Sequence, residues 1–148
     1  MTVGRICSRE VDLIDADESV QVAADRMNSR NVGTLIVLDE ESHPIGMITD
    51  RDLALRIVGK ARDSIQTLVS EVMTRFPDKI NEETTIELAL SKMRAGGFRR
   101  LPVVDNEGKL VGVLTLDDIL ELLSTEFTEI GRLIKKESPT SLACQTGR

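Results

Sequence analysis

Apolar residues follow two different spacings along this chain, and the same succession of spacings occurs twice. Two sets have the i, i+3, i+4, i+7 spacing of one helix face: Val20, Ala23, Ala24 and Met27, and then Ile86, Ala89, Leu90 and Met93. Ser19 and Thr85 stand just before these sets, where a hydroxyl oxygen can accept a hydrogen bond from a free amide of the first helical turn. The pattern predicts one capped helix in each half of the chain.

A short apolar run, a polar turn and a second apolar run follow each predicted helix. We expect strands at 35–38 and 45–49 in the first half, and at 101–104 and 111–115 in the second. Pro102 has no amide hydrogen, so its strand is expected at a sheet edge, or the proline near the start of the strand.

A further helix is predicted after the second strand of each half. The first is expected to stop at Gly59, and residues 60–68 then form a linker. The second keeps its apolar residues at helical spacing from Ile119 to Ile134, almost to Lys136. The second repeat is therefore expected to end in a longer helix than the first repeat.

The two halves are copies of one unit. A shift of 66 positions aligns residues 3–57 with 69–123 without a gap. A repeat of this length indicates two units that bury their apolar faces against each other, so a site at their seam is expected to occur twice. We divide the chain into a first repeat, a second repeat with an extended helix, and a polar tail: 1–62, 63–136 and 137–148.

Composition excludes several classes of protein. The net charge of −6 and the pI of about 4.9 argue against an electrostatic surface for nucleic acid, and Trp and Tyr are absent. No run approaches the roughly eighteen apolar residues that span a membrane, and the start lacks the pattern of a signal peptide. Cys7 and Cys144 are far apart, which favours reduced thiols and a cytoplasmic protein. The single histidine, His43, lies in a turn, and no cluster indicates a metal site or a catalytic nucleophile.

The motif G-x-x-T-x-x-D occurs at both predicted strand-to-helix junctions: Gly46, Thr49 and Asp52, and then Gly112, Thr115 and Asp118. A helix N-terminus attracts phosphate oxygens, the Thr hydroxyl can bind ribose or phosphate, and the Asp can accept from a ribose diol. The glycines would leave the strand bare so that a flat ligand can approach. The alternative is structural, because T-x-x-D is also a capping box. Two copies in register favour a site, and one Thr can both cap and bind.

Cations are distributed unequally between the two repeats. Arg99 and Arg100 precede a buried strand, where a guanidinium can turn toward phosphate. Neighbouring residues of a strand point to opposite faces, so at most one of them is expected to face the seam. The first repeat has Gly33-Thr34 at these positions, and Arg51 within its motif is the candidate replacement cation.

Both halves resemble cystathionine-β-synthase (CBS) domains, and the whole chain resembles a stand-alone CBS pair, or Bateman module. The resemblance covers about residues 3–123 and rests on Glu71-Val72-Met73-Thr74, on Arg100-Leu101-Pro102-Val103-Val104-Asp105 and on the two G-x-x-T-x-x-D motifs. It implies an α+β fold in which each repeat is a β-α-β-β-α unit related to the other by a pseudo-two-fold axis, with the two sheets face to face. It also implies adenine-nucleotide binding between the sheets and assembly into a disc-shaped dimer.

The resemblance also implies roles for particular residues. In the second-motif site, Asp118 holds the ribose, Thr115 holds ribose or phosphate, and Arg100 with Arg99 reaches phosphate. The base would lie against the opposite repeat, at Cys7, Asp12, Val32 and Gly33. For the first-motif site, the corresponding set is Thr49, Asp52 and Arg51, with the base against Met73, Asp78 and Phe98. The absence of a basic pair at Gly33-Thr34 distinguishes this site from the family pattern.

We therefore expect a non-catalytic regulatory module that senses cellular energy or metabolite state by binding an adenosyl ligand. AMP, ADP and ATP are the leading candidates, and S-adenosylmethionine and NAD(H) fit the same chemistry. Asp50 and Asp117 are compatible with a hydrated Mg²⁺ beside the phosphates. The expected partners are a regulated protein that the sequence does not identify and a second copy of the chain. The copies are expected to meet through the apolar helix after the second strand of each repeat, at Leu53, Ile57 and Val58 and at Ile119, Leu122 and Leu123. The alternative is a structural interaction scaffold whose T-x-x-D motifs are only helix caps.

Overall fold

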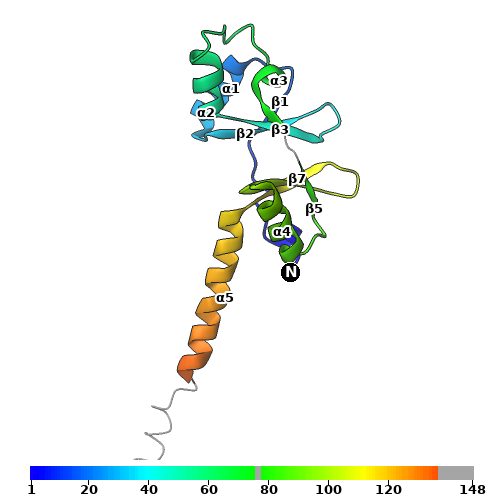
Figure 1. Ribbon diagram of the computed structural model, residues 1–148, viewed down its shortest axis with the longest axis vertical. Helices are drawn as coiled ribbons and strands as arrows, with labels where there is room; N and C mark the ends of the chain where they lie inside the picture. The colour runs from blue at the N-terminus through cyan, green and yellow to red at the C-terminus, as the bar shows by residue number, and fades with distance from the viewer. Residues whose placement is uncertain (76–77, 137–148) are drawn as a thin grey trace, which may run out of the picture.

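The computed structural model describes residues 1–75 and 78–136, so the tail predicted at 137–148 lies outside the described residues. Each half folds as strand, helix, two strands and helix, and the two halves are stacked (Figure 1). The first half contains β1 (Leu13–Asp15), α1 (Val20–Arg30), β2 (Thr34–Leu38), β3 (Pro44–Thr49) and α2 (Asp50–Leu53), which continues as the π-helix η2 (Ala54–Val58). The second contains β5 (Ile80–Asn81), α4 (Ile86–Gly96), β6 (Arg100–Val104), β7 (Leu110–Thr115) and α5 (Leu116–Lys136). The predicted α+β pair of β-α-β-β-α units is confirmed.

Local signals set the helix ends. The hydroxyl oxygens of Ser19 and Thr85 accept from Val22 N (3.3 Å) and Leu88 N (3.4 Å), so both predicted N-caps are confirmed. The helix after β3 ends at Gly59 as expected, but this glycine is right-handed (φ −64°). The left-handed residue that reverses the chain is Ala61 (φ 52°).

The two sheets have the orders β1-β2-β3-β4 and β5-β6-β7, where β4 is Thr74–Arg75. Because β6 is a central strand, the sheet edge is excluded as one of the two alternatives expected for Pro102, and the proline instead precedes the part of β6 that pairs with β5. In the first sheet, Ile36 N–H donates to Asp12 O (2.9 Å), and Pro102 occupies the equivalent position in the second sheet. There β5 pairs with β6 only from Val103 onward, so the missing amide hydrogen interrupts no ladder hydrogen bond.

Each hydrophobic core is completed by a segment that precedes the other repeat. Val69 and Val72 of the short helix α3 (Val69–Val72) are buried in the first core, although they open the second repeat. Val3, in the 3-10 helix η1 (Val3–Arg5), is buried in the second core, although it opens the chain. Backbone hydrogen bonds fix both segments, from Val69 N to Glu18 O (2.9 Å) and from Val3 N to Thr84 O (2.8 Å). The division of the chain at residue 62 thus remains a prediction about sequence repeats, since each core takes residues from both.

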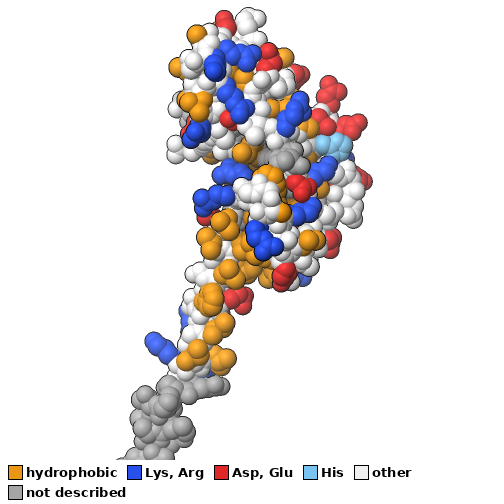
Figure 2. Space-filling view, in the orientation of Figure 1, with side chains coloured by type: hydrophobic (Ala, Val, Ile, Leu, Met, Phe, Trp, Pro, Cys, Tyr) orange, Lys and Arg blue, Asp and Glu red, His pale blue; other side chains and the backbone are white. Residues whose placement is uncertain are grey.

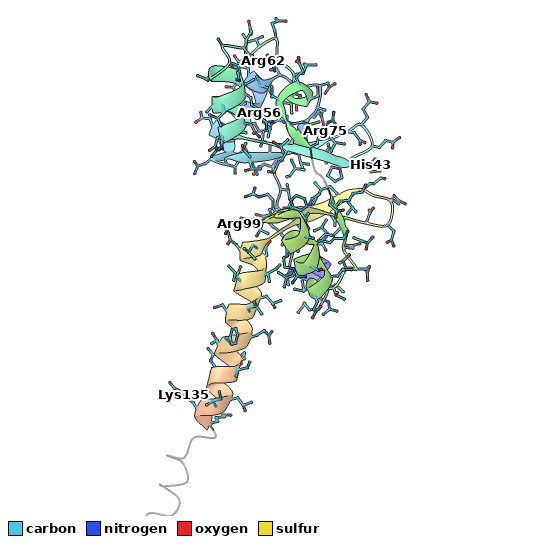
Figure 3. All side chains as sticks on the ribbon, viewed as in Figure 1. His43, Arg56, Arg62, Arg75, Arg99 and Lys135 are labelled. Atoms are coloured by element: carbon cyan, nitrogen blue, oxygen red, sulfur yellow. The ribbon has the colours of Figure 1, made fainter. Side chains whose placement is uncertain are left out.

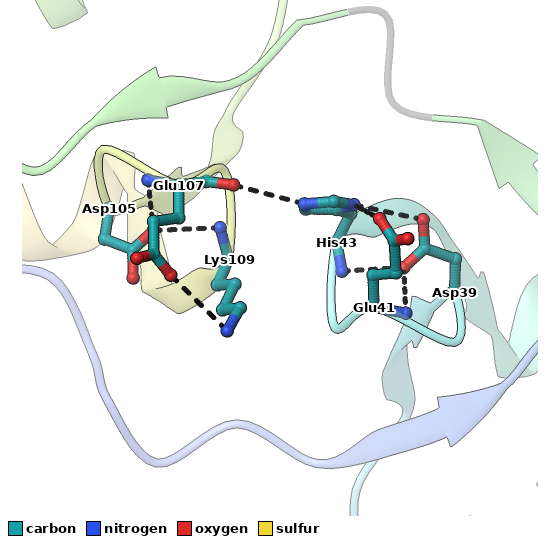
Figure 4. A network of polar contacts seen from close by, with 6 residues as sticks. All are labelled: Asp39, Glu41, His43, Asp105, Glu107 and Lys109. Carbon is teal, nitrogen blue, oxygen red and sulfur yellow. Dashed lines mark hydrogen bonds and ion pairs between the residues drawn. The ribbon is translucent and has the colours of Figure 1, made fainter.

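The loops of the two β-hairpins are joined across the seam (Figure 4). Leu110 N–H donates to Ser42 O (3.1 Å), and the His43 ring lies between Asp39 Oδ2 (3.3 Å from Nδ1) and Glu107 O (3.2 Å from Nε2). Both ring nitrogens face acceptors, so only the doubly protonated ring can donate to both. The amide of His43 also donates to Asp39, and this bond is the first cause that holds the pKa of Asp39 below its ordinary value.

Helix α5 packs against the second repeat only near its start and then extends away from it (Figure 1). Ile119 is buried in the second core, as Ile57 of η2 is in the first, so these two residues are not available for the subunit contact expected of them. Val58 and Leu123, from the same predicted sets, are 80% and 43% exposed. Apolar side chains continue along the projecting part of α5 (Figure 2).

The turn before α1 gives a pH-dependent test of stability. Glu18 accepts two hydrogen bonds from the Arg26 guanidinium (3.0 and 3.1 Å) and one from Asp15 N (2.9 Å), and the bond from Arg26 is the main reason that the Glu18 pKa falls below its ordinary 4.5. A lowered folded-state pKa stabilises the protein above the ordinary pKa, and this contribution is lost as the pH falls through the folded value. Glu18→Gln should lower the free energy of unfolding at pH 7 by up to about 1 kcal/mol. In denaturant titrations the difference from the wild type should shrink as the pH falls below 4.5; a difference of constant size would contradict the assignment.

Candidate functional site

A cleft of about 330 Å³ opens between the two sheets, a volume in the range of small-molecule sites. One wall comes from β2 and the chain before it, and the other comes from β6 and β7. The lining residues are Ser8, Glu10, Val11, Asp12, Val32, Gly33, Thr34, Ile36, Arg100, Val113 and Thr115. The cleft therefore contains five of the residues predicted for the second-motif site: Asp12, Val32, Gly33, Arg100 and Thr115.

The second motif forms a complete capping box at the start of α5. Thr115 N and Thr115 Oγ1 both lie 2.8 Å from Asp118 Oδ2, and Asp118 N donates to Thr115 Oγ1 (3.1 Å). Thr115 lines the cleft, whereas Asp118 is not one of the lining residues and is half-buried next to Thr115. The other carboxylate oxygen of Asp118, Oδ1, accepts no hydrogen bond from the described residues. The cap thus fixes both side chains and leaves one carboxylate oxygen for a ligand.

Cys7 lies close to Asp118 but inside the second core. Burial is the largest cause that raises the pKa of its thiol; the nearby Arg9 opposes this shift, and the carboxylate of Asp118 adds to it. Cys7 does not line the cleft, and its burial disfavours the reactive thiolate.

Arg100 supplies the cation of the cleft. Its Nη1 lies 3.4 Å from Thr34 Oγ1 on the opposite wall, a long contact that leaves the guanidinium able to bind an anion. The neighbouring Arg99 is exposed at the edge of the seam and does not line the cleft (Figure 3). The expectation that one of the two arginines faces the seam agrees with this geometry.

Two residues on the other wall contact other parts of the first repeat. Asp12 Oδ1 lies 2.7 Å from Arg30 Nε, so this carboxylate is paired with a guanidinium. A Cβ on Gly33 would lie 2.9 Å from the Asp50 carboxylate, and Asp50 N donates to Gly33 O (3.0 Å). Gly33 thus lets the first motif approach this wall closely.

The first motif forms the same capping box. Thr49 N donates to Asp52 Oδ2 (3.0 Å), Asp52 N donates to Thr49 Oγ1 (3.1 Å), and Asp52 Oδ1 is 3.7 Å from Arg56. Arg51 is exposed at the start of α2.

The residues predicted to face the base in the first-motif site lie in different surroundings. Met73 is buried in the first core, Phe98 packs on the second core, and Asp78 lies 3.5 Å from Lys92 Nζ. The counterparts of Glu10 and Val11 are residues 76 and 77, which lie outside the described residues. The first-motif site therefore stays a prediction.

The motif glycines have a role that the sequence did not indicate. A Cβ on Gly112 would lie 2.5 Å from Ser8 O, and one on Gly46 would lie 2.7 Å from Thr74 O. The open face of each strand is occupied by the backbone of the segment that crosses from the other repeat, so the expectation that a flat ligand uses this space was wrong.

Several cleft residues were not predicted: Ser8, Glu10, Val11, Thr34, Ile36 and Val113. The alignment of the two repeats could have indicated one of them, Thr34, because it is the counterpart of Arg100 and faces it across the seam. The others depend on where the N-terminal segment crosses the second sheet.

A larger hollow, of about 490 Å³, lies between β1 and the first hairpin loop. Four carboxylates line it, from Asp15, Asp17, Asp39 and Glu40, without a Lys or Arg. This charge disfavours a phosphate, so the smaller cleft with Arg100 is the better candidate for an anionic ligand.

Among residues 1–75 and 78–136 there is no group of three or more His, Cys, Asp or Glu side chains placed to hold a metal ion. Within the same ranges, no helix combines the length and the apolar character needed to cross a membrane.

Comparison with known proteins identifies the repeats. The model of the CBS domain matches residues 3–59 and 69–125. An uncharacterized protein of Methanopyrus kandleri is 30% identical over 122 residues, which are 82% of this chain and 62% of that protein. The chain thus spans less than two thirds of that relative.

Two similar solved structures contain ligands. CBSX2 of Arabidopsis thaliana, in complex with AMP, is 25% identical and has a TM-score of 0.68, with 84% of this chain and 97% of that chain covered. The CBS domain pair of protein MJ0100, in complex with 5-methylthioadenosine and S-adenosyl-L-methionine, is 26% identical with a TM-score of 0.68, and the shares covered are 85% and 98%.

The crossing of Ser8 over Gly112 can be tested by one added methyl group. Gly112→Ala should lower the free energy of unfolding by about 1–3 kcal/mol, because the backbone oxygen of Ser8 must move. Gly131→Ala is the matched control: nothing lies within 4 Å of its Cβ in α5, so helix propensity should make it neutral or stabilising. Equal effects of the two substitutions in denaturant titrations would show that the strand is not closely covered.

Proposed function

The chain belongs to the CBS-domain family, and on this premise we propose that it is a non-catalytic regulatory module of the cytoplasm that binds an adenosyl ligand. The observation that carries the proposal is the second-motif cleft, which joins a cation, a helix N-terminus and an apolar wall. These are the three surfaces that phosphate, ribose and adenine require. The adenosyl ligands of CBSX2 and MJ0100 support this ligand class.

In the proposed complex each wall binds one part of the ligand. Arg100 pairs with phosphate, and Asp118 accepts from the ribose hydroxyls through its free oxygen. Thr115 adds its hydroxyl oxygen as an acceptor, because its proton is already donated to Asp118. The base lies along Val32 and Gly33 of the first repeat.

The first motif is proposed as a second site with a different cation. Thr49 and Asp52 take the places of Thr115 and Asp118, and Arg51 takes the place of Arg100. Asp52 is already within 3.7 Å of Arg56, so less of its charge is available to a ligand. We therefore expect the second-motif cleft to bind more tightly. AMP, ADP and ATP, with Mg²⁺ beside a polyphosphate, are the leading ligands; S-adenosylmethionine and NAD(H) share the adenosine.

Regulation requires that the ligand bind two arrangements of the module with different affinity. The cleft is suited to this because its walls belong to different repeats, and the contact that Arg100 makes with Thr34 across the cleft is a long hydrogen bond. A ligand that draws Arg100 to its phosphate breaks this link. We propose that the module passes this change to a regulated protein as a homodimer.

The alternative is a scaffold without a ligand, and one observation favours it. Both T-x-x-D motifs form full capping boxes, so helix capping alone can account for their Thr and Asp.

Ligand binding separates the two functions. AMP, ADP, ATP, S-adenosylmethionine and NAD(H) should be titrated into ligand-free protein by calorimetry, with inorganic phosphate as a control. At least one of them should bind and raise the melting temperature, since a ligand that binds only the folded state stabilises it. A scaffold would show neither heat nor stabilisation with any of them.

Matched substitutions separate binding from capping. Asp118→Ala and Asp52→Ala should each lower the free energy of unfolding by about 0.5–2 kcal/mol, because both remove a cap. Only Asp118→Ala should also weaken binding in the second-motif cleft, by about 1.5–3 kcal/mol. If both variants lose stability and neither loses affinity, the scaffold is the correct function.

Arg100 and Arg99 form a second matched pair. Arg100→Ala should weaken AMP by about 1.5–3 kcal/mol and adenosine far less, because its proposed contact is the phosphate. Arg99→Ala should leave both affinities nearly unchanged. Equal losses of AMP and adenosine would exclude a phosphate contact by Arg100.

A further inference from the structure

The projecting part of α5 has an uncovered apolar stripe. Residues 126–136 lie beyond the second match to the CBS domain, yet the helix continues to Lys136. Phe127, Ile130 and Ile134 are 68%, 51% and 64% exposed. An apolar stripe of this length on a surface helix indicates a contact.

The spacing of the stripe indicates what covers it. Its members alternate four and three residues apart, which is the heptad spacing of a coiled coil: Leu116, Leu120, Leu123, Phe127, Ile130 and Ile134. Ile119 and Leu122, which pack on the second core, lie at one side of the stripe and do not interrupt it. The stripe needs another helix with the same spacing, and a second copy of α5 provides one.

Charge along α5 indicates the direction of pairing. The acidic side chains stand in its first two thirds: Asp117, Asp118, Glu121, Glu126 and Glu129. The basic ones stand at its end: Arg132, Lys135 and Lys136. A parallel pair would place like charges together, whereas an antiparallel pair places the acidic part of one helix beside the basic end of the other. Antiparallel helix dipoles favour the same arrangement.

We propose that two copies of the chain pair through α5 in an antiparallel coiled coil, so that the second repeat of each copy lies beside the C-terminal end of the other copy's α5. This inference rests on the homodimer of the proposed function and specifies its interface. The register places Leu116, Leu120 and Leu123 against Ile134, Ile130 and Phe127 of the partner subunit, and it brings Lys135 of the partner subunit beside Asp117. An acidic polar face makes a membrane surface a poorer partner than a second copy.

Disulfide trapping tests the direction and the register in a Cys144→Ser background. Leu120→Cys and Ile130→Cys proteins, mixed and oxidised, should form a cross-linked dimer that contains one chain of each. Each protein alone should cross-link no more than Thr125→Cys, whose side chain lies on the outward face of the helix. Strong cross-linking of Leu120→Cys with itself would show parallel pairing and overturn the inference.

Light scattering tests whether the stripe holds the dimer. The wild type should have twice the chain mass, and Phe127→Glu with Ile130→Glu should have the mass of one chain. Both side chains are exposed, so the melting curve of the repeats should keep its cooperativity and the variant should still bind AMP in the cleft. A monomeric wild type, or a variant that remains a dimer, would overturn the inference; loss of AMP binding by the wild type would instead reject the proposed function.

Charge exchange tests the end of the register. Lys135→Glu should raise the dimer dissociation constant about fivefold, since two exposed ion pairs are lost from each dimer. Adding Asp117→Lys should restore it. Failure of the second substitution to restore the dimer would contradict the contact between Asp117 and Lys135 of the partner subunit.

Discussion

The close crossing of two backbone segments at Gly112 and Gly46 is the constraint on which this molecule depends. At each crossing, the segment that precedes one repeat lies directly against a strand of the other repeat. A Cβ on Gly112 would lie 2.5 Å from the backbone oxygen of Ser8, and a Cβ on Gly46 would lie 2.7 Å from that of Thr74. The crossing segments then complete the cores with Val3 and with Val69 and Val72. Neither core is complete within one sequence repeat, so the two repeats must fold together and present their sheets to each other.

The cleft follows from this arrangement. The pseudo-two-fold axis brings equivalent positions of the two repeats face to face. Because the two sequences differ at this position, the arginine Arg100 faces its counterpart Thr34 rather than a second arginine. The motif residues beside it have two roles of different strength. The hydrogen bonds of Thr115 and Asp118 show that these residues cap α5. The cap holds both side chains in place, which lowers the entropic cost of binding a ligand beside them.

Much of the fold could be predicted from local pattern, because helix caps and strand alternation are set by neighbours in sequence. Ser19 and Thr85 cap the predicted helices, and β2, β3, β6 and β7 lie within a residue of their expected bounds, whereas no bounds were predicted for β1, β4 and β5. The errors concern contacts between distant segments. Gly112 was taken to make room for a ligand, because nothing near it in sequence shows that Ser8 crosses there. For Pro102 the sequence left two positions open, a sheet edge or the start of its strand, because it does not show that the neighbouring β5 begins to pair only at Val103. The same limit hid Ser8, Glu10 and Val11 from the predicted site.

The central claim is that an adenosyl ligand occupies the cleft between the sheets, and a map of amide chemical shifts during titration with AMP tests it most directly. The account predicts saturable shifts at Val32, Gly33, Thr34, Arg100 and Thr115, which line both walls of that cleft. Shifts confined to the acidic hollow around Asp15, Asp17 and Glu40, or no shifts at saturating AMP, ADP, ATP and S-adenosylmethionine, would contradict it.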